Sequence, residues 1–596
     1  MTRAAPRSRD ERSAADRRRA ALGLTAIVAV ALALRWWGAS FGLPATYHPD
    51  EHQYVDAAVA AVGGALNPGR FNNPSLLKYA LAAVYACWYA IGRLAGAWPT
   101  VGAWQAAVTA DPTIAYVIAR ALVGALGAST CIVVAMIGRR LRDGTTGLVA
   151  AALLAIAFLH VRDGHYAVND VPAALLTTLA VAIALRVRAT GRGRDLVVGA
   201  AVVGLAAATK YTALVAVLPV GLGWLAAADG RPGPGDGGAD GGERSGGDEH
   251  RRGLVLADAI RGLRRQIVSP AVAVAALVLV VAFVCAVPYA VLDWPAFHAD
   301  VALLATRGRE GFKGLQIDPA PGWIFYLKSL GWGLGWPLLA AAIAGLALAL
   351  RRRRADDVIV AVVPLVLWGY LGSQLNMFAR FMLPAVPLLC VFAADAVVVA
   401  GGSLARRFSR RAGGDASRSR KAGPYVAALA LAVGLPSLIA AVRHDVLLGR
   451  TDTRELARRW IADHVPAGAT ILLQSGGPEL DGLDMAVESV GTLELPERPL
   501  DDWQKEFGAT DPVWLVTSSF STERRQLDRA RDAAARAWYA DLARRWRPSA
   551  TFTPLRAGGN SDAAPQFVFD QVYGPCTDLW RFDRPGPTVN VFRLSR

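Results

Sequence analysis

The sequence predicts a mainly α-helical, polytopic membrane protein with about eleven transmembrane helices and a C-terminal extracytoplasmic α/β domain. Of its 596 residues, 54% are hydrophobic and only 19% are charged, whereas soluble domains carry about a quarter charged residues. The hydrophobic residues gather in runs, such as 271–287 and 426–442, that approach the roughly 20 apolar residues needed to cross a bilayer. Arginine clusters stand at the ends of these runs, as is typical of multi-pass membrane proteins.

The net charge of +16 comes from these arginines and does not point to nucleic acid. Because each cluster borders an apolar run, the charge sets the membrane topology and the bilayer is the expected partner. The basic residues 1–19 form a cytoplasmic tail, and the first span is uncleaved because Arg35-Trp36-Trp37 stands where a small-residue cleavage site belongs. The candidate spans are 20–37, 114–137, 146–160, 171–187, 196–209, 212–228, 270–291, 323–350, 358–375, 382–400 and 424–442.

This count makes 20–442 the transmembrane domain of a plasma-membrane protein, with the N-terminus cytoplasmic and the C-terminal residues outside. The apolar run 76–98 is not counted as a transmembrane span, because a further crossing would move the arginines of the next loops to the outer side of the membrane. It is predicted to be an interfacial helix within a long first outer loop, 39–112. The Gly-rich residues 229–253 are predicted to be a disordered cytoplasmic linker.

The composition becomes that of a soluble protein from Arg443, which predicts an extracytoplasmic α/β domain over 443–596. TDTRELARRWIADHV has the spacing of an amphipathic helix, and STERRQLDRARDAAARAWYADLARRW that of a long exposed helix. ATILLQS, DPVWLVTSS and PTVNVFRL read as strands. Trp side chains of this domain suit either core packing or stacking on sugars: Trp460, Trp503, Trp514, Trp538, Trp546 and Trp580.

The stretch YHPDEHQY (47–54) fits the H-x-x-E-H pattern of a class of zinc proteases. Pro49 lies inside it and is tolerated best at the first position of a helix. A helix that begins at Pro49 leaves His48 outside, so that His48 and His52 do not form a metal-binding pair on one face. No third ligand has a recognisable spacing, and the sequence therefore disfavours zinc. An alternative, that Asp50 and Glu51 only cap the helix, stays open.

In the predicted topology YHPDEHQY faces HVRDGHYAVND (160–170) at the outer surface, and together the two segments contain several histidines and acids. Acidic side chains at a membrane boundary are energetically unfavourable and therefore indicate a functional site. A carboxylate there can act as a general base toward a hydroxyl. Only six lysines accompany 58 arginines, yet Lys78 and Lys210 fall at the membrane level. A phosphate would be their natural partner, and the alternative is that they reach for the lipid headgroups.

Six segments in this order resemble the polyprenyl-phosphate-dependent glycosyltransferases of the GT-C superfamily, in the protein O-mannosyltransferase and aminoarabinose-transferase branch. They are the acidic pair 50–51, NPSLLKY, HVRDGHYAVNDVPAA, ATKYTAL, VPYAVLDWPAF and ARFMLPAVP. The resemblance covers about residues 20–400 and implies a membrane enzyme that uses a polyprenyl-phosphate sugar donor. The expected acceptor is a hydroxyl of an extracytoplasmic glycan, lipid or protein.

The resemblance also implies roles for individual residues. Asp50 corresponds to the base on the acceptor, Glu51 to its supporting neighbour, and Asp170 to the second acid. The donor phosphate is expected on Lys78, Lys210, Arg380 and Arg162. Phe381 stands where the family often has tyrosine, and NPSLLKY lacks the second proline of the family. The supporting candidates are His48, His52, Asp163, His165 and Tyr166.

The implied reaction is an inverting transfer in which the departing phosphate is stabilised by cations and Asp50 takes the proton late. No cofactor or metal is required, although a divalent ion between Asp50 and Asp170 stays open as a weak signal. Two rival functions also stay open. One is a transporter or lipid flippase of cell-envelope glycan precursors, although the sequence has no convincing internal repeat. The other is a scaffold that binds envelope glycans without turnover.

Overall fold

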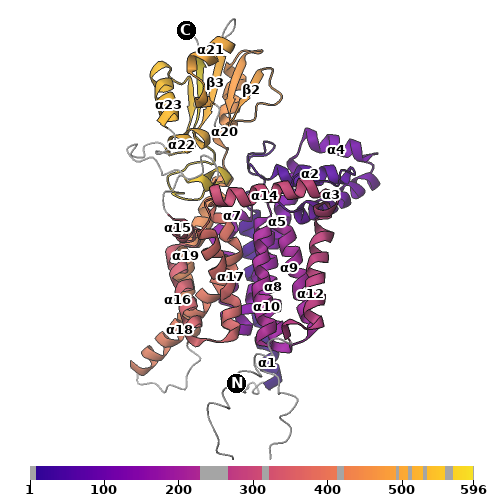
Figure 1. Ribbon diagram of the computed structural model, residues 1–596. Coiled ribbons are helices and arrows are strands. Elements are labelled where there is room, and N and C mark those ends of the chain that lie inside the picture. The colour runs from indigo at the N-terminus through magenta and orange to yellow at the C-terminus, as the bar shows by residue number, and fades with distance from the viewer. Residues whose placement is uncertain are drawn as a thin grey trace, which may run out of the picture.

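The computed structural model describes residues 9–227, 266–311, 321–411, 422–491, 495–507, 513–527, 533–556 and 568–594. The predicted linker 229–253 and the first eight residues of the basic tail lie outside these ranges. Figure 1 shows a helix bundle with the N-terminus at its lower end, and a domain with a small sheet at its upper end. The terms upper and lower end are used below in this sense.

Long apolar helices form the bundle, and a helix occupies each of the predicted spans. Among the described residues, six helices are long and apolar enough to cross a membrane, or seven if one bent pair counts as a span. The chain is therefore a multi-pass membrane protein, while the number of crossings stays a prediction. The helices are α1 (Arg9–Trp36), α5 (Thr113–Leu141), α6 (Gly144–Ala155), α8 (Asp170–Thr190), α9 (Gly193–Thr209), α10 (Val217–Ala226), α12 (Pro270–Ala286), α16 (Trp336–Arg352), α17 (Ala355–Gly372), α18 (Val386–Arg411) and α19 (Ala422–Leu448).

The predicted span 323–350 is not one straight helix. It consists of α15 (Gly322–Leu334) and α16, which meet at an angle of 116°. Gly335 joins them at φ +79°, a conformation that glycine adopts without steric cost. The apolar composition could not reveal this bend, because both helices are apolar.

Three short helices lie together at the upper end, to one side of the bundle: α2 (His52–Val62), α3 (Leu76–Leu94) and α4 (Val101–Ala110). They belong to the predicted first outer loop, and α3 occupies the run that was kept out of the span count. Leu77, Leu81 and Tyr85 form its buried face, while Ile91 and Leu94 are exposed. An interfacial role for α3 suits this exposure and stays a prediction. Near α3, α14 (Trp294–Glu310) crosses the same end of the bundle.

The C-terminal domain is built on a five-stranded sheet in the order β2-β1-β3-β5-β4. The strands β1 (Thr470–Gln474), β3 (Val513–Ser518) and β5 (Val589–Leu594) fall where the sequence predicts them. The edge strands β2 (Ala486–Val490) and β4 (Ala550–Phe552) were not predicted, because β2 is mostly exposed and β4 has three residues. Every residue of β3 is buried, and β3 pairs with β1 in parallel and with β5 antiparallel.

Helices cover this sheet. The predicted amphipathic helix is α20 (Thr453–His464), and the predicted long helix is described as α22 (Ser519–Leu527) and α23 (Ala533–Arg545), with the residues between them outside the described ranges. A further helix, α21 (Leu500–Phe507), was not predicted. Trp503, Trp514 and Trp538 are buried in the domain core, and of the six tryptophans considered for sugar stacking only Trp580 is largely exposed. Core packing therefore accounts for most of them.

Buried hydrogen bonds join this domain to the bundle. Arg443, near the upper end of α19, donates to the carbonyl oxygens of Leu579 at 3.3 Å and Phe582 at 2.6 Å. Arg454 of α20 donates to the carbonyl of Tyr47 at 3.3 Å. The C-terminal domain is thus fixed directly above the segment that holds Asp50.

Candidate active site

A cavity of about 680 Å³ lies where the upper end of the bundle meets the C-terminal domain. Lining residues from the bundle side come from 49–54 at the start of α2, from the surroundings of Asp170 and Lys210, and from α14. The C-terminal domain contributes Phe520, Ser521 and the short 3-10 helix Phe569–Tyr573. Four of the predicted site residues line this cavity: Asp50, Asp170, Lys210 and Arg380.

Asp50 and Arg380 form an ion pair on the cavity wall. Arg380 Nη1 donates to Asp50 Oδ2 at 2.7 Å, and the Asp50 side chain remains 22% exposed. Gln53 Nε2 donates to the other carboxylate oxygen at 3.3 Å. The Arg380 guanidinium lies 4.0 Å from the centroid of the Tyr573 ring, a distance typical of a cation–π contact. Asp50 is therefore held in place, yet open to the cavity.

Asp170 and Lys210 form the second ion pair. Asp170 begins α8, and Lys210 directly follows α9, so that the upper ends of two neighbouring helices bring the charges together. Lys210 Nζ also lies 4.5 Å from the centroid of the Phe381 ring. Phe381, where the family often has tyrosine, thus contacts the lysine through its ring face. The cavity holds two carboxylates, each paired with a cation.

Glu51 is separated from the cavity, although it adjoins Asp50 in sequence. Its carboxylate accepts hydrogen bonds from Arg120 Nε at 2.8 Å and Arg120 Nη2 at 2.7 Å, and a third from the Ala167 amide at 2.8 Å. Both side chains of the pair are fully buried. Glu51 thus links α5 to the 164–169 turn and does not line the cavity.

Neither Glu51 nor Asp50 caps α2 through its side chain. The helix begins at His52, three residues after the predicted start at Pro49, and Glu51 makes no side-chain capping bond. As predicted, His48 lies outside the helix, and the two histidines do not share a face. The alternative in which the acids serve only as helix caps therefore has no side-chain capping bond to support it.

Lys78 and Arg162, predicted to bind phosphate, are also directed elsewhere. Lys78 Nζ donates to the carbonyl of Arg70 at 3.1 Å, and burial lowers the pKa of Lys78 to about 8. Arg162 is fully buried, pairs with Asp163 at 3.1 Å, and donates to the carbonyl of Asp570 at 2.6 Å. Neither residue lines the cavity. Arg162 and Asp163 instead hold the Phe569–Tyr573 segment against the bundle.

The supporting histidines have different surroundings. His48 is buried and stacks on Tyr166 at a centroid distance of 4.5 Å. Burial and the nearby Arg380 hold the pKa of His48 well below its usual range, so the neutral ring can accept the Asp50 amide hydrogen at Nδ1, 3.2 Å away. His52 is exposed and does not line the cavity. His48 therefore orients the backbone of Asp50, and His52 has no comparable position.

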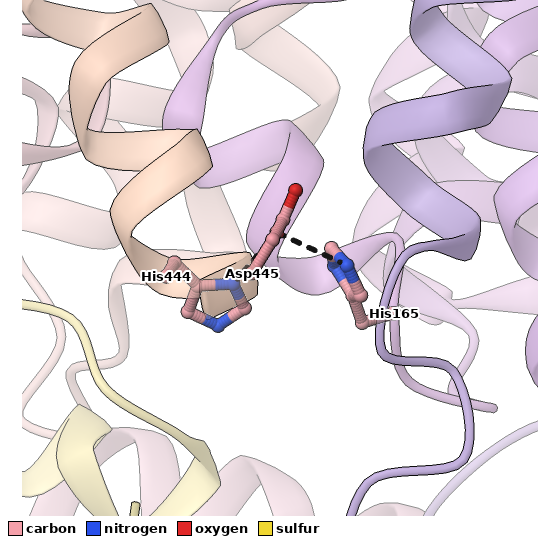
Figure 2. A group of neighbouring side chains, drawn as sticks. All are labelled: His165, His444 and Asp445. Atoms are coloured by element: carbon pink, nitrogen blue, oxygen red, sulfur yellow. Dashed lines mark hydrogen bonds and ion pairs between the residues drawn. The ribbon is translucent and has the colours of Figure 1, made fainter. Parts of the chain in front are cut away.

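His165 belongs to a buried cluster with His444 and Asp445 near the upper end of α19, and Figure 2 shows the ion pair between His165 and Asp445. The three ligand atoms lie within 4.8 Å of one another, a spacing that a metal could use. However, His165 Nδ1 lies 2.9 Å from the Val161 carbonyl and Nε2 lies 3.0 Å from the Trp37 carbonyl. Both ring nitrogens therefore already lie within hydrogen-bonding distance of protein oxygens, and Nε2 also lies 3.2 Å from Asp445 Oδ1. The cluster ties α19 to the 164–169 turn.

Sequence reasoning missed several residues of this region. Arg120, Tyr573 and the pair His444-Asp445 all contact predicted residues, but they lie far from them along the chain. Asn169 stands inside the quoted segment HVRDGHYAVND, and Asn72 and Asn73 directly precede Pro74. Asn169 adjoins Asp170, and Asn73 is the first residue of the quoted segment NPSLLKY; these positions were the one signal that could have drawn attention to the amides.

Comparison with known proteins gives one matching family model and several solved structures of similar fold. Residues 99–232 match the family model described as dolichyl-phosphate-mannose-protein mannosyltransferase. The oligosaccharyltransferase of Archaeoglobus fulgidus, solved with a tethered acceptor peptide, has a TM-score of 0.50 at 13% identity, over 89% of this chain and 72% of that one. The fold is that of a GT-C glycosyltransferase. No curated protein matches the sequence.

Two further solved structures are similar to this chain. The Archaeoglobus fulgidus enzyme in complex with an inhibitory peptide and a dolichol-phosphate has a TM-score of 0.50 at 13% identity, over 87% of this chain and 71% of that one. ArnT from Cupriavidus metallidurans bound to undecaprenyl phosphate has a TM-score of 0.46 at 16% identity, over 88% and 96%. The residues that match the family model include Asp170 and Lys210, whereas Asp50 and Arg380 lie outside the match.

Proposed function

We propose that this GT-C protein transfers a sugar, with inversion, from a polyprenyl-phosphate-linked donor to an acceptor hydroxyl, and that Asp50 is the base. The observation that carries the proposal is the pair of carboxylate–cation contacts, Asp50–Arg380 and Asp170–Lys210, on one cavity. Acid and cation side by side suit a reaction in which a proton is taken up and an anion departs.

The donor phosphate would lie against Lys210 and Arg380. Both cations line the cavity, whereas Lys78 and Arg162 do not. An arginine can bind phosphate through two parallel hydrogen bonds, and a lysine adds a compact positive charge. Apolar residues of α14 and α17 that also line the cavity, Val301, Leu304 and Leu371, offer a surface for the first isoprene units. The dolichol-phosphate in a structure of the same fold is consistent with such a ligand.

The reaction itself is a single displacement. The acceptor oxygen attacks the anomeric carbon from the face opposite the phosphate, and the carbon–oxygen bond to phosphate breaks with its electron pair on the leaving oxygen. Lys210 and Arg380 stabilise that developing charge. Because an ordinary carboxylate is a weak base for an alcohol, Asp50 takes the proton late, as the forming bond acidifies the hydroxyl. Asp170 holds Lys210 on the phosphate side.

The cavity and the C-terminal domain, 443–596, are proposed to face the extracytoplasmic side of the plasma membrane. The last turns of α5 and α16 carry Arg139-Arg140 and Arg351-Arg352, and both helices run toward the lower end, where the N-terminus lies. Arginine-rich helix ends face the cytoplasm in multi-pass proteins. The acceptor would accordingly be an extracytoplasmic glycan, lipid or protein.

The decisive experiment replaces the base. Asp50→Asn keeps the shape of the side chain, and its protein should insert and fold while transfer from lipid-linked sugar donors falls by about 10²- to 10⁴-fold, the contribution typical of a general base. Asp56→Asn is the matched control, because Asp56 is an exposed residue of α2 that does not line the cavity. Transfer at the wild-type rate by the Asp50→Asn protein would disprove the role of Asp50.

A further inference from the structure

Six amide side chains of the described residues line the cavity. Four of them form a connected set beside Asp50. Gln53 Oε1 accepts from Asn72 at 3.3 Å and from Asn73 at 3.2 Å. Asn169 donates to Asn73 at 3.4 Å, and Gln53 donates to Asp50 at 3.3 Å. The amide set of the cavity is Gln53, Asn72, Asn73, Asn169, Gln374 and Asn376.

Two acceptors of this amide set are buried and lack a partner. Within the described ranges, no hydrogen-bond donor reaches Asn72 Oδ1 or Asn376 Oδ1. Asn72 precedes α3, whereas Asn376 lies between α17 and the 3-10 helix Ala379–Ala385, so the two oxygens come from separate walls. A buried amide oxygen without a donor is unfavourable, and a ligand hydroxyl would supply that donor.

The charges of the cavity favour an uncharged sugar. Within the described ranges, its charged lining residues are Lys210, Arg307, Arg380, Asp50 and Asp170. Each of the two carboxylates is already paired with a cation, and the amide set carries no formal charge that could pair with a charged sugar. A sugar with its own carboxylate or ammonium group would leave a net charge in a partly buried site, where unbalanced charge is costly.

We propose that the amide set binds the hydroxyl groups of a neutral donor sugar, and that Asn72 and Asn376 determine this specificity as hydrogen-bond acceptors. This inference rests on the proposed function, since it assumes a lipid-phosphate donor in the same cavity. Amides both donate and accept, so they match hydroxyls of either orientation without adding charge. Lys210 and Arg380 bind the phosphate, and the amide set distinguishes the sugar attached to it.

The test measures equilibrium binding to the purified full chain in lipid nanodiscs. The probes are polyprenyl phosphate without a sugar and its mannosyl, glucuronosyl and glucosaminyl derivatives, which carry a neutral, a negative and a positive sugar. The wild type should bind the mannosyl lipid about tenfold more tightly than either charged glycolipid. Asn72→Ala and Asn376→Ala should each weaken mannosyl-lipid binding about five- to tenfold and leave bare polyprenyl phosphate unchanged.

Asn67→Ala is the matched control, because Asn67 is an exposed asparagine bonded to Asp293 and does not line the cavity. Equal weakening of the bare and mannosyl lipids in both cavity variants would overturn the role of the amides. A wild type that prefers a charged glycolipid would overturn the neutral-sugar inference and leave the proposed function standing. A wild type that binds none of the four lipids would overturn both. Asn376→Ala keeps the test intact if Asn72→Ala does not fold.

Discussion

Asp50 and Glu51 are neighbours in sequence, but their ion pairs are of opposite kinds. The Glu51–Arg120 pair is fully buried, and each Glu51 oxygen accepts at least one hydrogen bond. The Asp50–Arg380 pair has one short contact, and its side chains remain 22% and 11% exposed. A buried carboxylate whose oxygens all accept hydrogen bonds from the protein stabilises the fold. A carboxylate at a cavity that can still accept further hydrogen bonds can exchange its protein partner for a substrate.

The same contrast separates the cations. Arg162 and Arg120 are completely buried and donate to several protein oxygens each. Arg380 and Lys210 have a carboxylate and an aromatic ring as neighbours and line the cavity. The positive charges on the cavity can therefore turn toward a phosphate, and the buried ones cannot. The comparison predicts that substitutions in the first group affect folding and those in the second affect chemistry.

The largest effect on stability is expected from Glu51→Ala. It leaves the Arg120 guanidinium buried without a carboxylate and the Ala167 amide without its acceptor. Removing one partner of a buried pair typically costs about 3–5 kcal/mol of unfolding free energy. Thermal unfolding in detergent, or the yield of folded protein in membranes, measures this loss.

The neighbouring substitution Asp50→Ala is the internal control for that measurement. It should lower the unfolding free energy by no more than about 1 kcal/mol, because partly exposed pairs contribute little. Comparable destabilisation by both variants would show that Asp50 stabilises the fold as much as Glu51 does, and would contradict the predicted difference between the two carboxylates.

An intermediate effect is expected from Arg380→Ala, and it concerns the donor. Loss of a charge-assisted contact to phosphate should raise the donor KM about 10- to 100-fold and leave the acceptor KM unchanged. Arg380→Lys keeps the positive charge but lacks the planar guanidinium above Tyr573. Its donor KM should therefore lie between that of the wild type and that of the Arg380→Ala protein. Steady-state kinetics with each substrate varied in turn gives both constants.

Arg351→Ala is the control for this substitution, because Arg351 lies at the end of α16 away from the cavity. If the acceptor KM rises in the Arg380→Ala protein while the donor KM stays constant, the arginine binds the acceptor and the phosphate assignment is wrong.

Hydrophobic patterning was enough to predict where the long apolar helices of the bundle lie, because a membrane-spanning segment is defined by its own composition. The predicted spans all contain helices, and three of the five strands fall on predicted segments. Asp50, Asp170, Lys210 and Arg380 were expected from the family resemblance and meet on one cavity. For these residues, local motifs and a known order of segments carried sufficient information.

The failures share one physical cause, which is that a buried polar side chain is defined by a partner far away in sequence. Glu51 bonds to Arg120, 69 residues later, and Arg162 bonds to a carbonyl 408 residues later. Motifs place such residues next to the site but cannot tell whether they face it. The orientation of Tyr573 over Arg380 depends on the same long-range packing of the C-terminal domain.

Substitution of Lys78 should have the smallest effect on catalysis, and its effect should instead appear in the pH dependence of the unfolding free energy. Burial lowers its pKa to about 8 from the 10.5 of an exposed lysine. Between these values the unfolded chain binds more protons than the folded chain, so the contribution of Lys78 to the unfolding free energy rises with pH. Lys78→Met should remove this rise, as measured by comparing thermal unfolding of the variant and the wild type across that window. The donor KM should not change, because Nζ donates to the Arg70 carbonyl away from the cavity. A raised donor KM in the Lys78→Met protein would instead indicate that Lys78 binds the donor phosphate, as proposed for Arg380, and is not a purely structural residue like Arg162.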